Sequence, residues 1–170
     1  MTSLTAYHQL GKFIVDFQHL ERAVTNLMFL LAEPSDSESI RILINELGYN
    51  QRLKTVDVLF ARFIDLKRDV NPTDKAEFHN LIGLLNTLGE RRNDLVHSKY
   101  MQWLNVEGKS GLIRENSKLR GGAGILLQQE EELLPETFNV DLQNLHDASQ
   151  TIEKFRLKVI DYLYPDVSSN

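Results

Sequence analysis

Residues 90–100 contain a cluster of side chains that suit acid–base chemistry and phosphate binding. The cluster includes Arg92 and Asn93, which precede His97 by five and four residues. Imidazole is the side chain that gains and loses a proton most readily near neutral pH, and guanidinium binds phosphate oxygens bidentately. On a helix, residues four apart share a face, so Asn93 is placed to orient the His97 ring. These types and spacings indicate phosphodiester cleavage without a metal ion.

RNA is the substrate that such a cluster would suit. A neutral His97 would accept the proton of a 2′-hydroxyl, and the freed oxygen would attack the adjacent phosphorus. Arg92 would stabilise the charge that builds on the phosphoryl oxygens. Five residues of an ideal helix separate the two side chains by roughly 140°. Three arrangements remain open: a long Arg92 side chain reaches round, the helix loosens, or a second copy of the chain supplies the complement across a two-fold axis.

Structural interpretations compete with the catalytic one. Arg92 falls on the apolar stripe of its helix, where an ion pair with Asp16 or Glu21 of the first helix would explain it. His97 would be explained by a position at the helix C-terminus, where the helix dipole favours a cation. In that case both residues would stabilise the fold and perform no chemistry.

A local excess of positive charge surrounds the cluster. Residues 91–120 hold seven Lys and Arg against three Asp and Glu, a balance of +4 in a chain whose net charge is −5. Such a segment attracts a phosphate backbone, and aromatic side chains stack on unpaired bases. Trp103 also suits a core or an interface. The candidate RNA-binding residues are Arg91, Lys99, Tyr100, Trp103 and Arg114.

Several other classes of site are excluded by the sequence. The chain has no cysteine, so it contains no disulfide or thiolate metal site. Its histidines lack metal-ligand spacing, and Gly108-Lys109-Ser110 lacks the first glycine of a P-loop, because Trp103 stands there. We therefore expect neither a metal nor a cofactor. With no signal peptide and no apolar run near the ~20 residues that span a bilayer, the sequence predicts a cytoplasmic protein.

Apolar residues spaced three and four apart predict helices at five places. Their approximate ranges are 4–32, 38–47, 51–66, 73–99 and 140–163. Alternation over 101–106 and 112–116, with a turn at 107–111, predicts a β-hairpin, and 125–134 can form one more short strand. The predicted fold is all-α: an up-and-down bundle of about five helices, with a small β-hairpin insertion at about 101–135 before the last helix. We expect a single domain over 1–166 and a frayed tail over 167–170.

Arg92-Asn93-x-x-x-His97 resembles the Arg-x4–6-His motif of the HEPN superfamily, in which a polar residue, often Asn, follows the Arg. The resemblance implies a helical domain of about this length with the motif near the end of a long helix. Many HEPN proteins are metal-independent endoribonucleases that act as toxins, phage-defence effectors or RNA-processing factors. By this resemblance, Arg92 would stabilise phosphoryl charge, Asn93 would position the site, and His97 would be the acid–base group.

The resemblance also implies partners. HEPN proteins commonly dimerise so that two motifs form one composite site, which predicts a homodimer that acts on RNA. Some pair with a nucleotidyltransferase antitoxin and carry His-x-Tyr after the motif. Here two residues separate His97 from Tyr100, which weighs against that pairing. Other members are inactive, so the alternative hypothesis is a non-catalytic dimeric interaction or ligand-binding module.

Overall fold

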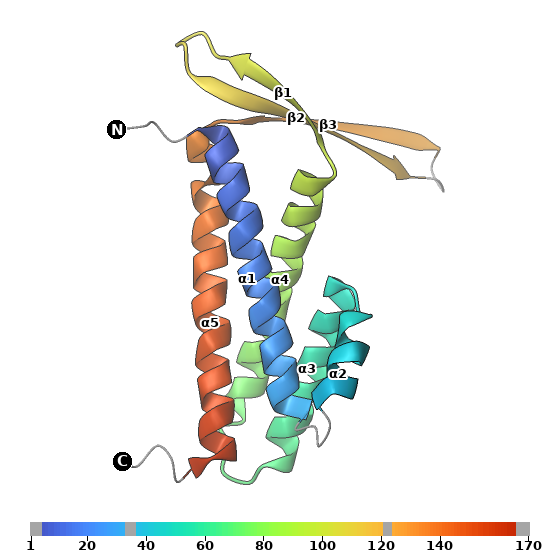
Figure 1. The fold of residues 1–170 in the computed structure, drawn as a ribbon, viewed down its shortest axis with the longest axis vertical. Coiled ribbons are helices and arrows are strands. Elements are labelled where there is room, and N and C mark those ends of the chain that lie inside the picture. Colours follow the sequence, from blue (N-terminus) through green and yellow to red (C-terminus); the bar gives the residue numbers. More distant parts are fainter. Residues whose placement is uncertain (1–4, 33–36, 121–123, 166–170) are drawn as a thin grey trace. The chain divides into compact units, whose positions relative to one another are not determined.

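The computed structural model describes residues 5–32, 37–120 and 124–165 of the chain. Five α-helices lie within these ranges: α1 (Ala6–Ala32), α2 (Ser37–Asn45), α3 (Tyr49–Leu66), α4 (Thr73–Val96) and α5 (Asn139–Leu163) (Figure 1). Between α4 and α5 come strands β1 (Lys99–Leu104), β2 (Ser110–Arg120) and β3 (Ile125–Leu133), then a short 3₁₀-helix, Pro135–Phe138. The prediction of a largely helical chain with about five helices is confirmed.

The description of the insertion as a small β-hairpin is wrong, because it is a three-stranded antiparallel sheet in the order β1-β2-β3. Strands β1 and β2 form the predicted hairpin, and β3 lies where one more short strand was predicted. Strand β2 continues to Arg120, well beyond its predicted end at 116. Its first half pairs with β1, from Leu104↔Ser110 to Lys99↔Glu115. The rest of β2 is mostly polar and has no apolar alternation to reveal a strand. It is extended because β3 pairs with it from Leu112↔Leu133 to Arg120↔Ile125.

The predicted turn between the first two strands is confirmed, and it begins slightly earlier than expected. The Asn105 Oδ1 atom accepts hydrogen bonds from the backbone N–H groups of Glu107 at 3.0 Å and Lys109 at 2.8 Å. Gly108 has a φ of +77°, which a glycine adopts without strain. In Gly108-Lys109-Ser110, the first two residues therefore belong to the turn between the strands, and Ser110 begins β2.

The chain divides into two compact units, residues 1–17 with 90–145 and residues 18–89 with 146–170. Helices α1, α4 and α5 contribute residues to both units. The single domain over 1–166 and the up-and-down arrangement stay predictions, and the predicted tail, 167–170, lies outside the described residues. None of the helices in the described ranges combines the length and apolar character needed to cross a membrane.

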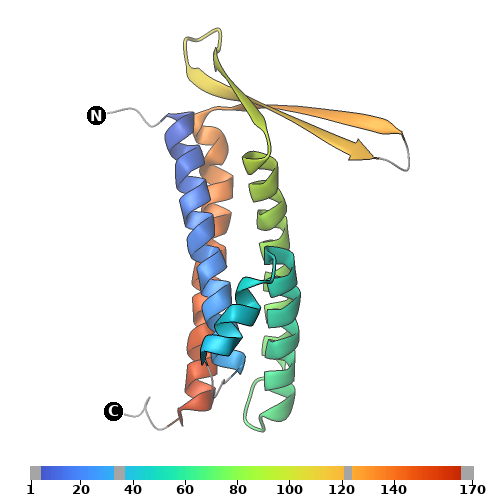
Figure 2. The same ribbon diagram turned by 45° about the vertical axis from the view of Figure 1, so that its right-hand side comes forward.

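In the first unit, the sheet lies across the start of α1, the end of α4 and the start of α5 (Figures 1 and 2). Leu112 and Leu133 are paired across β2 and β3 and are both fully buried, so they define the inward face of the sheet. Because side chains alternate along a strand, Arg114 and Glu131 point to this same face. The apolar core of the unit includes Phe13, Phe17, Leu95, Leu112, Leu133, Phe138 and Leu145.

The second unit is built around three aromatic rings from three helices. Phe60 of α3 stacks on Phe78 of α4, with ring centroids 4.1 Å apart. Phe155 of α5 meets both rings edge-on, at 5.3 Å and 5.1 Å. Such pairs stabilise a core beyond the area they bury. Tyr49, at the start of α3, donates a hydrogen bond to the Leu85 carbonyl at 3.0 Å, which fixes its ring against α4.

Two glycines of α4 give a matched test of this packing. A Cβ on Gly89 would lie 2.6 Å from the Tyr49 ring, whereas a Cβ on Gly83 meets nothing within 4 Å. We expect Gly83→Ala to raise the free energy of unfolding by about 0.5–1 kcal/mol, because alanine favours a helix. Gly89→Ala should instead lower it by about 1–3 kcal/mol through overpacking. Urea unfolding measures both, and equal stability of the two variants would contradict the packing described for Tyr49.

Candidate functional site

The motif residues lie at the C-terminal end of α4, in the first unit. Arg92 and Asn93 belong to its last turns, and His97 follows directly after the helix ends at Val96. The His97 N–H donates to the Asn93 carbonyl at 3.0 Å, so the backbone keeps a helical hydrogen bond up to this residue. Asn93 and His97 are exposed, and Arg92 is half-buried. The sequence pattern extended this helix to residue 99, but the chain leaves it three residues earlier, because Lys99 begins β1.

Within the first unit, the groups that contact the Arg92 guanidinium are neutral. Its guanidinium lies over the Phe17 ring, 5.8 Å from the centroid, and its Nη1 donates to Asn93 Oδ1 at 3.1 Å. In the described part of this unit no carboxylate forms an ion pair with Arg92, and Asp16 instead accepts a hydrogen bond from Lys12. Arg92 therefore carries a positive charge that its own unit does not neutralise.

The His97 ring does not have the hydrogen-bond partner that its sequence spacing predicts. Asn93 was expected to orient this imidazole, but its side-chain oxygen binds Arg92. The Asn93 oxygen is engaged by the guanidinium, although the backbone hydrogen bond from His97 to the Asn93 carbonyl keeps the helical spacing of the two residues. Among the described residues, the His97 ring has no hydrogen-bond partner, and it is exposed to solvent. An interior ion pair of Arg92 with Glu21 stays a prediction, because Glu21 belongs to the other unit.

Arg91, the neighbour of Arg92, is fixed by two carboxylates. Its Nε donates to Asp141 Oδ2 at 2.8 Å, and its Nη1 and Nη2 donate to the two oxygens of Glu131 at 2.7 Å and 2.9 Å. Glu131 also accepts a hydrogen bond from Arg114 Nε at 2.8 Å. One carboxylate of β3 thus joins the end of α4 to β2. Only 5% of Arg114 is exposed, so this pairing compensates a nearly buried charge.

These charges influence one another strongly. Burial alone would raise the pKa of Glu131, but hydrogen bonds from Arg91 and the charges of Arg91 and Arg114 outweigh it and hold that pKa below its usual range. Burial likewise opposes the charge on Arg91, and its hydrogen bonds to Glu131 and Asp141 still raise its pKa. Glu131 and Arg91 therefore both remain ionised at neutral pH.

Three side chains bind the carbonyl groups at the end of α4. Ser98 Oγ and Tyr100 OH donate to the carbonyls of Asp94 and Leu95, respectively. Arg114 Nη1 donates to the Asp94 carbonyl at 3.3 Å and to Ser98 Oγ at 3.2 Å. We call this set of hydrogen bonds from Ser98, Tyr100 and Arg114 the α4 cap. Ser98 lies past the helix end, where helix carbonyls lack backbone donors.

The remaining RNA-binding candidates occupy different environments. Lys99 is exposed on β1, whereas Tyr100 is half-buried, and burial raises its pKa despite the opposing charges of Arg114 and Arg91. Trp103 is half-buried, and its Nε1 is a buried atom without a hydrogen-bond partner among the described residues. A role in RNA binding stays a prediction for all five candidates. Of the five, Lys99 has its charge most openly exposed.

Sequence reasoning missed the acidic partners of this region. The acidic run at Glu130–Glu132 was given no role by the sequence pattern, yet Glu131 binds two arginines. A signal was present in the charge count, which stopped at residue 120. Residues 121–141 add five acidic residues and no Lys or Arg, and they convert the local balance of +4 into −1. The basic segment is thus largely neutralised within its own unit.

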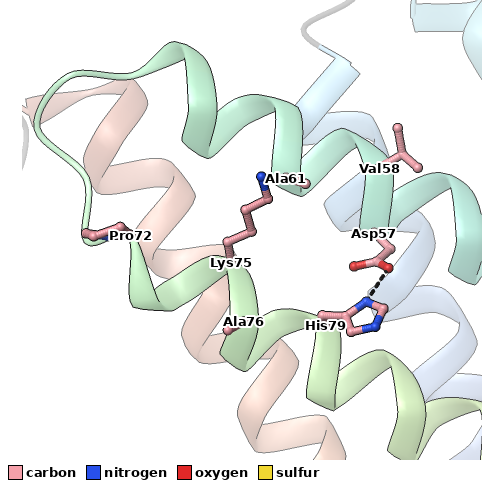
Figure 3. A pocket seen from close by; sticks show the side chains of 7 residues that line it. All are labelled: Asp57, Val58, Ala61, Pro72, Lys75, Ala76 and His79. Carbon is pink, nitrogen blue, oxygen red and sulfur yellow. Dashed lines mark hydrogen bonds and ion pairs between the residues drawn. The ribbon is translucent and has the colours of Figure 1, made fainter.

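A separate pocket of about 440 Å³ lies between α3 and α4 in the second unit (Figure 3). Asp57 and His79 point toward each other at its edge, with Nδ1 2.7 Å from Oδ2. Lys75 extends across it and binds Asp65 at 2.9 Å and 3.0 Å. The polar ends of Asp57, His79 and Lys75 are therefore each already engaged, the first two with one another and the third with Asp65. Within the described residues, no group of three or more His, Asp or Glu is placed to hold a metal ion.

No protein-family model, no curated protein and no solved structure matches this chain. The case for a site therefore depends on the contacts at the end of α4. There, Arg92, whose contacts within its unit are neutral, and the exposed His97 lie on one short segment. The neighbouring Arg91 attaches this segment to the sheet through Glu131.

The paired charges give a pH-dependent prediction. Glu131→Gln should lower the free energy of unfolding by about 2 kcal/mol at neutral pH, because two guanidinium groups lose a shared carboxylate. Since the pKa of Glu131 is lowered in the folded state, its stabilisation is complete above the unfolded pKa and is lost as pH falls through the folded value. The gap between parent and variant should shrink between about pH 7 and pH 3.

Urea unfolding at both pH values measures this gap. Glu153→Gln is the matched control, because Glu153 pairs with Arg156 on the exposed surface of α5, where an ion pair contributes little. A gap for Glu131→Gln that is absent at neutral pH, or unchanged in acid, would contradict the role assigned to this carboxylate.

Proposed function

We propose that this protein is a HEPN-like, metal-independent endoribonuclease of the toxin or phage-defence type, with Arg92 and His97 as its catalytic residues. The supporting observation is the contrast between two adjacent arginines. Arg91 binds two carboxylates, whereas Arg92, within the described residues of its unit, interacts with an aromatic ring and an amide and with no carboxylate. The positive charge of Arg92, close in sequence to an exposed His97, is available to a phosphate.

The proposed reaction is transesterification at a 2′-hydroxyl. Neutral His97 accepts the hydroxyl proton, the 2′ oxygen bonds to phosphorus, and the bond from phosphorus to the 5′ oxygen breaks. A protonated imidazole donates a proton to that 5′ oxygen, and the products are a 2′,3′-cyclic phosphate and a 5′-hydroxyl. Arg92 stabilises the additional negative charge on the phosphoryl oxygens. Asn93 holds the guanidinium of Arg92 through its side-chain oxygen.

A homodimer supplies what one chain lacks. The reaction uses one imidazole as base and another as acid, and each chain offers one His97. A two-fold axis beside the end of α4 would bring two copies of Arg92 and His97 into one site. The exposed Lys99, two residues beyond His97, would contact a neighbouring phosphate.

The alternative function is a non-catalytic dimeric interaction or ligand-binding module. The observation in its favour is that Arg91 and Arg114 bind carboxylates, which removes much of the basic field. Under this alternative, the end of α4 is a structural junction and purified protein leaves RNA intact.

Cleavage of RNA in the presence of EDTA tests the proposed function. We expect the parent protein to cleave a mixed RNA pool and to leave 2′,3′-cyclic phosphate ends. His97→Ala and Arg92→Ala should each lower the rate by a factor on the order of 10²–10⁴, the usual contribution of such groups. The matched controls His146→Ala and Arg22→Ala replace exposed residues of the other unit and should cleave like the parent. Equal activity of all five proteins would assign the cleavage to a contaminant.

Mixing the parent with an inactive variant tests the composite site. If the site needs His97 from both chains, a dimer of the parent chain with His97→Ala is inactive. We expect a co-refolded 1:1 mixture to keep about a quarter of the activity of the same total amount of parent, because about a quarter of its dimers contain two parent chains. If each chain acts with its own Arg92 and His97 alone, the mixture will keep about half.

A further inference from the structure

The α4 cap holds the backbone on both sides of His97. The carbonyls of Asp94 and Leu95 precede His97, and the side chains of Ser98 and Tyr100 that bind them follow it. The residues that follow His97 are therefore hydrogen-bonded to the last turn of the helix that the chain has just left. Without these donors, the last carbonyls of α4 would depend on water, and the last turn would fray.

The sheet provides the rest of the cap. Arg114 of β2 reaches both the Asp94 carbonyl and Ser98 Oγ with the same Nη1 atom. Its Nε is held by Glu131 of β3 at 2.8 Å, and Glu131 is held in turn by Arg91 of α4. These contacts form a closed ring from α4 through β3 and β2 back to α4. Because guanidinium is planar and rigid, fixing its Nε also fixes the direction of Nη1.

The burial of these groups gives the ring its rigidity. Arg114 is 5% exposed, and the side chain of Arg91 is 19% exposed. Hydrogen bonds between charged groups strengthen where water is excluded. The exposed His97 thus lies on a stretch of backbone that the ion pairs of Arg91, Glu131 and Arg114 hold in place.

We infer that the three-stranded sheet is a positioning device for His97, and that Ser98, Tyr100 and Arg114 are positioning residues of the proposed ribonuclease. This inference rests on the proposed function. Proton transfer requires the imidazole to be placed within a fraction of an ångström of its substrate atom. The sheet meets that requirement by fixing the main chain beside His97, while the His97 ring itself remains free to meet the substrate.

Conservative variants test this inference. Tyr100→Phe keeps the ring and removes only the hydroxyl that binds the Leu95 carbonyl, and Ser98→Ala removes one donor to the Asp94 carbonyl. Tyr162→Phe is the matched control, because its hydroxyl binds Asp74 at 3.1 Å in the other unit. Three quantities are measured for each protein: kcat and KM for RNA cleavage, hydrogen exchange of the His97 amide, and Tm.

We expect Tyr100→Phe and Ser98→Ala each to lower kcat about tenfold with KM within about twofold of the parent, because substrate still binds while the imidazole is misplaced. The His97 amide, which binds the Asn93 carbonyl at 3.0 Å, should exchange about tenfold faster as the last turn opens. Tyr162→Phe should lower Tm to a similar degree and leave kcat and His97 exchange at parent values.

Two results would overturn the inference: parent-like kcat and His97 exchange in both cap variants, or a rise in KM with kcat unchanged. If the parent protein cleaves no RNA, the proposed function and the catalytic role of the cap fail together. Amide exchange then still decides whether the cap holds His97, so failure of the cap is distinguishable from failure of the enzyme assignment.

Discussion

The first unit depends on the hydrogen bonds that the carboxylate of Glu131 accepts. It accepts hydrogen bonds from Arg91 on α4 and from Arg114 on β2, so a single side chain of β3 joins three elements. A guanidinium as deeply buried as that of Arg114 is costly to fold without a partner. The pairing also fixes strand register, because a slip of β2 by one residue would turn Arg114 and Leu112 to the outer face, away from Glu131 and Leu133.

The neighbouring arginines show how little a residue type reveals about its role. Arg91 and Arg92 follow one another in a helix, so their side chains leave it about 100° apart. One direction leads to the carboxylates of Glu131 and Asp141, and the other leads to the ring of Phe17 and the amide of Asn93. The first arginine is a structural residue of the sheet junction. The second arginine, Arg92, is the candidate for binding a phosphate group.

The sequence predicted much of the helical framework, because apolar residues at three-four spacing mark the buried face of a helix. The starts of α3 and α5 were predicted within two residues of Tyr49 and Asn139. The end of α4 was predicted too late, because Arg92 and Lys99 continued the spacing of its stripe. The position of the motif at a helix end also followed from the pattern. The partners of Arg91 did not, because they lie 40 and 50 residues away in polar segments that carry no periodic signal.

The unequal lengths of the strands have a consequence for the protein in solution. Pairing of β1 with β2 ends at Lys99↔Glu115, while β2 runs on to Arg120 with β3 on its other side. Over these last residues, none of the described strands covers the β1-side edge of β2, and its open backbone groups bind water or another chain. An open edge of this kind invites association of copies by strand addition. Its sequence, Asn-Ser-Lys-Leu-Arg, is mostly polar, and a short, polar edge is one of the means by which proteins limit such association.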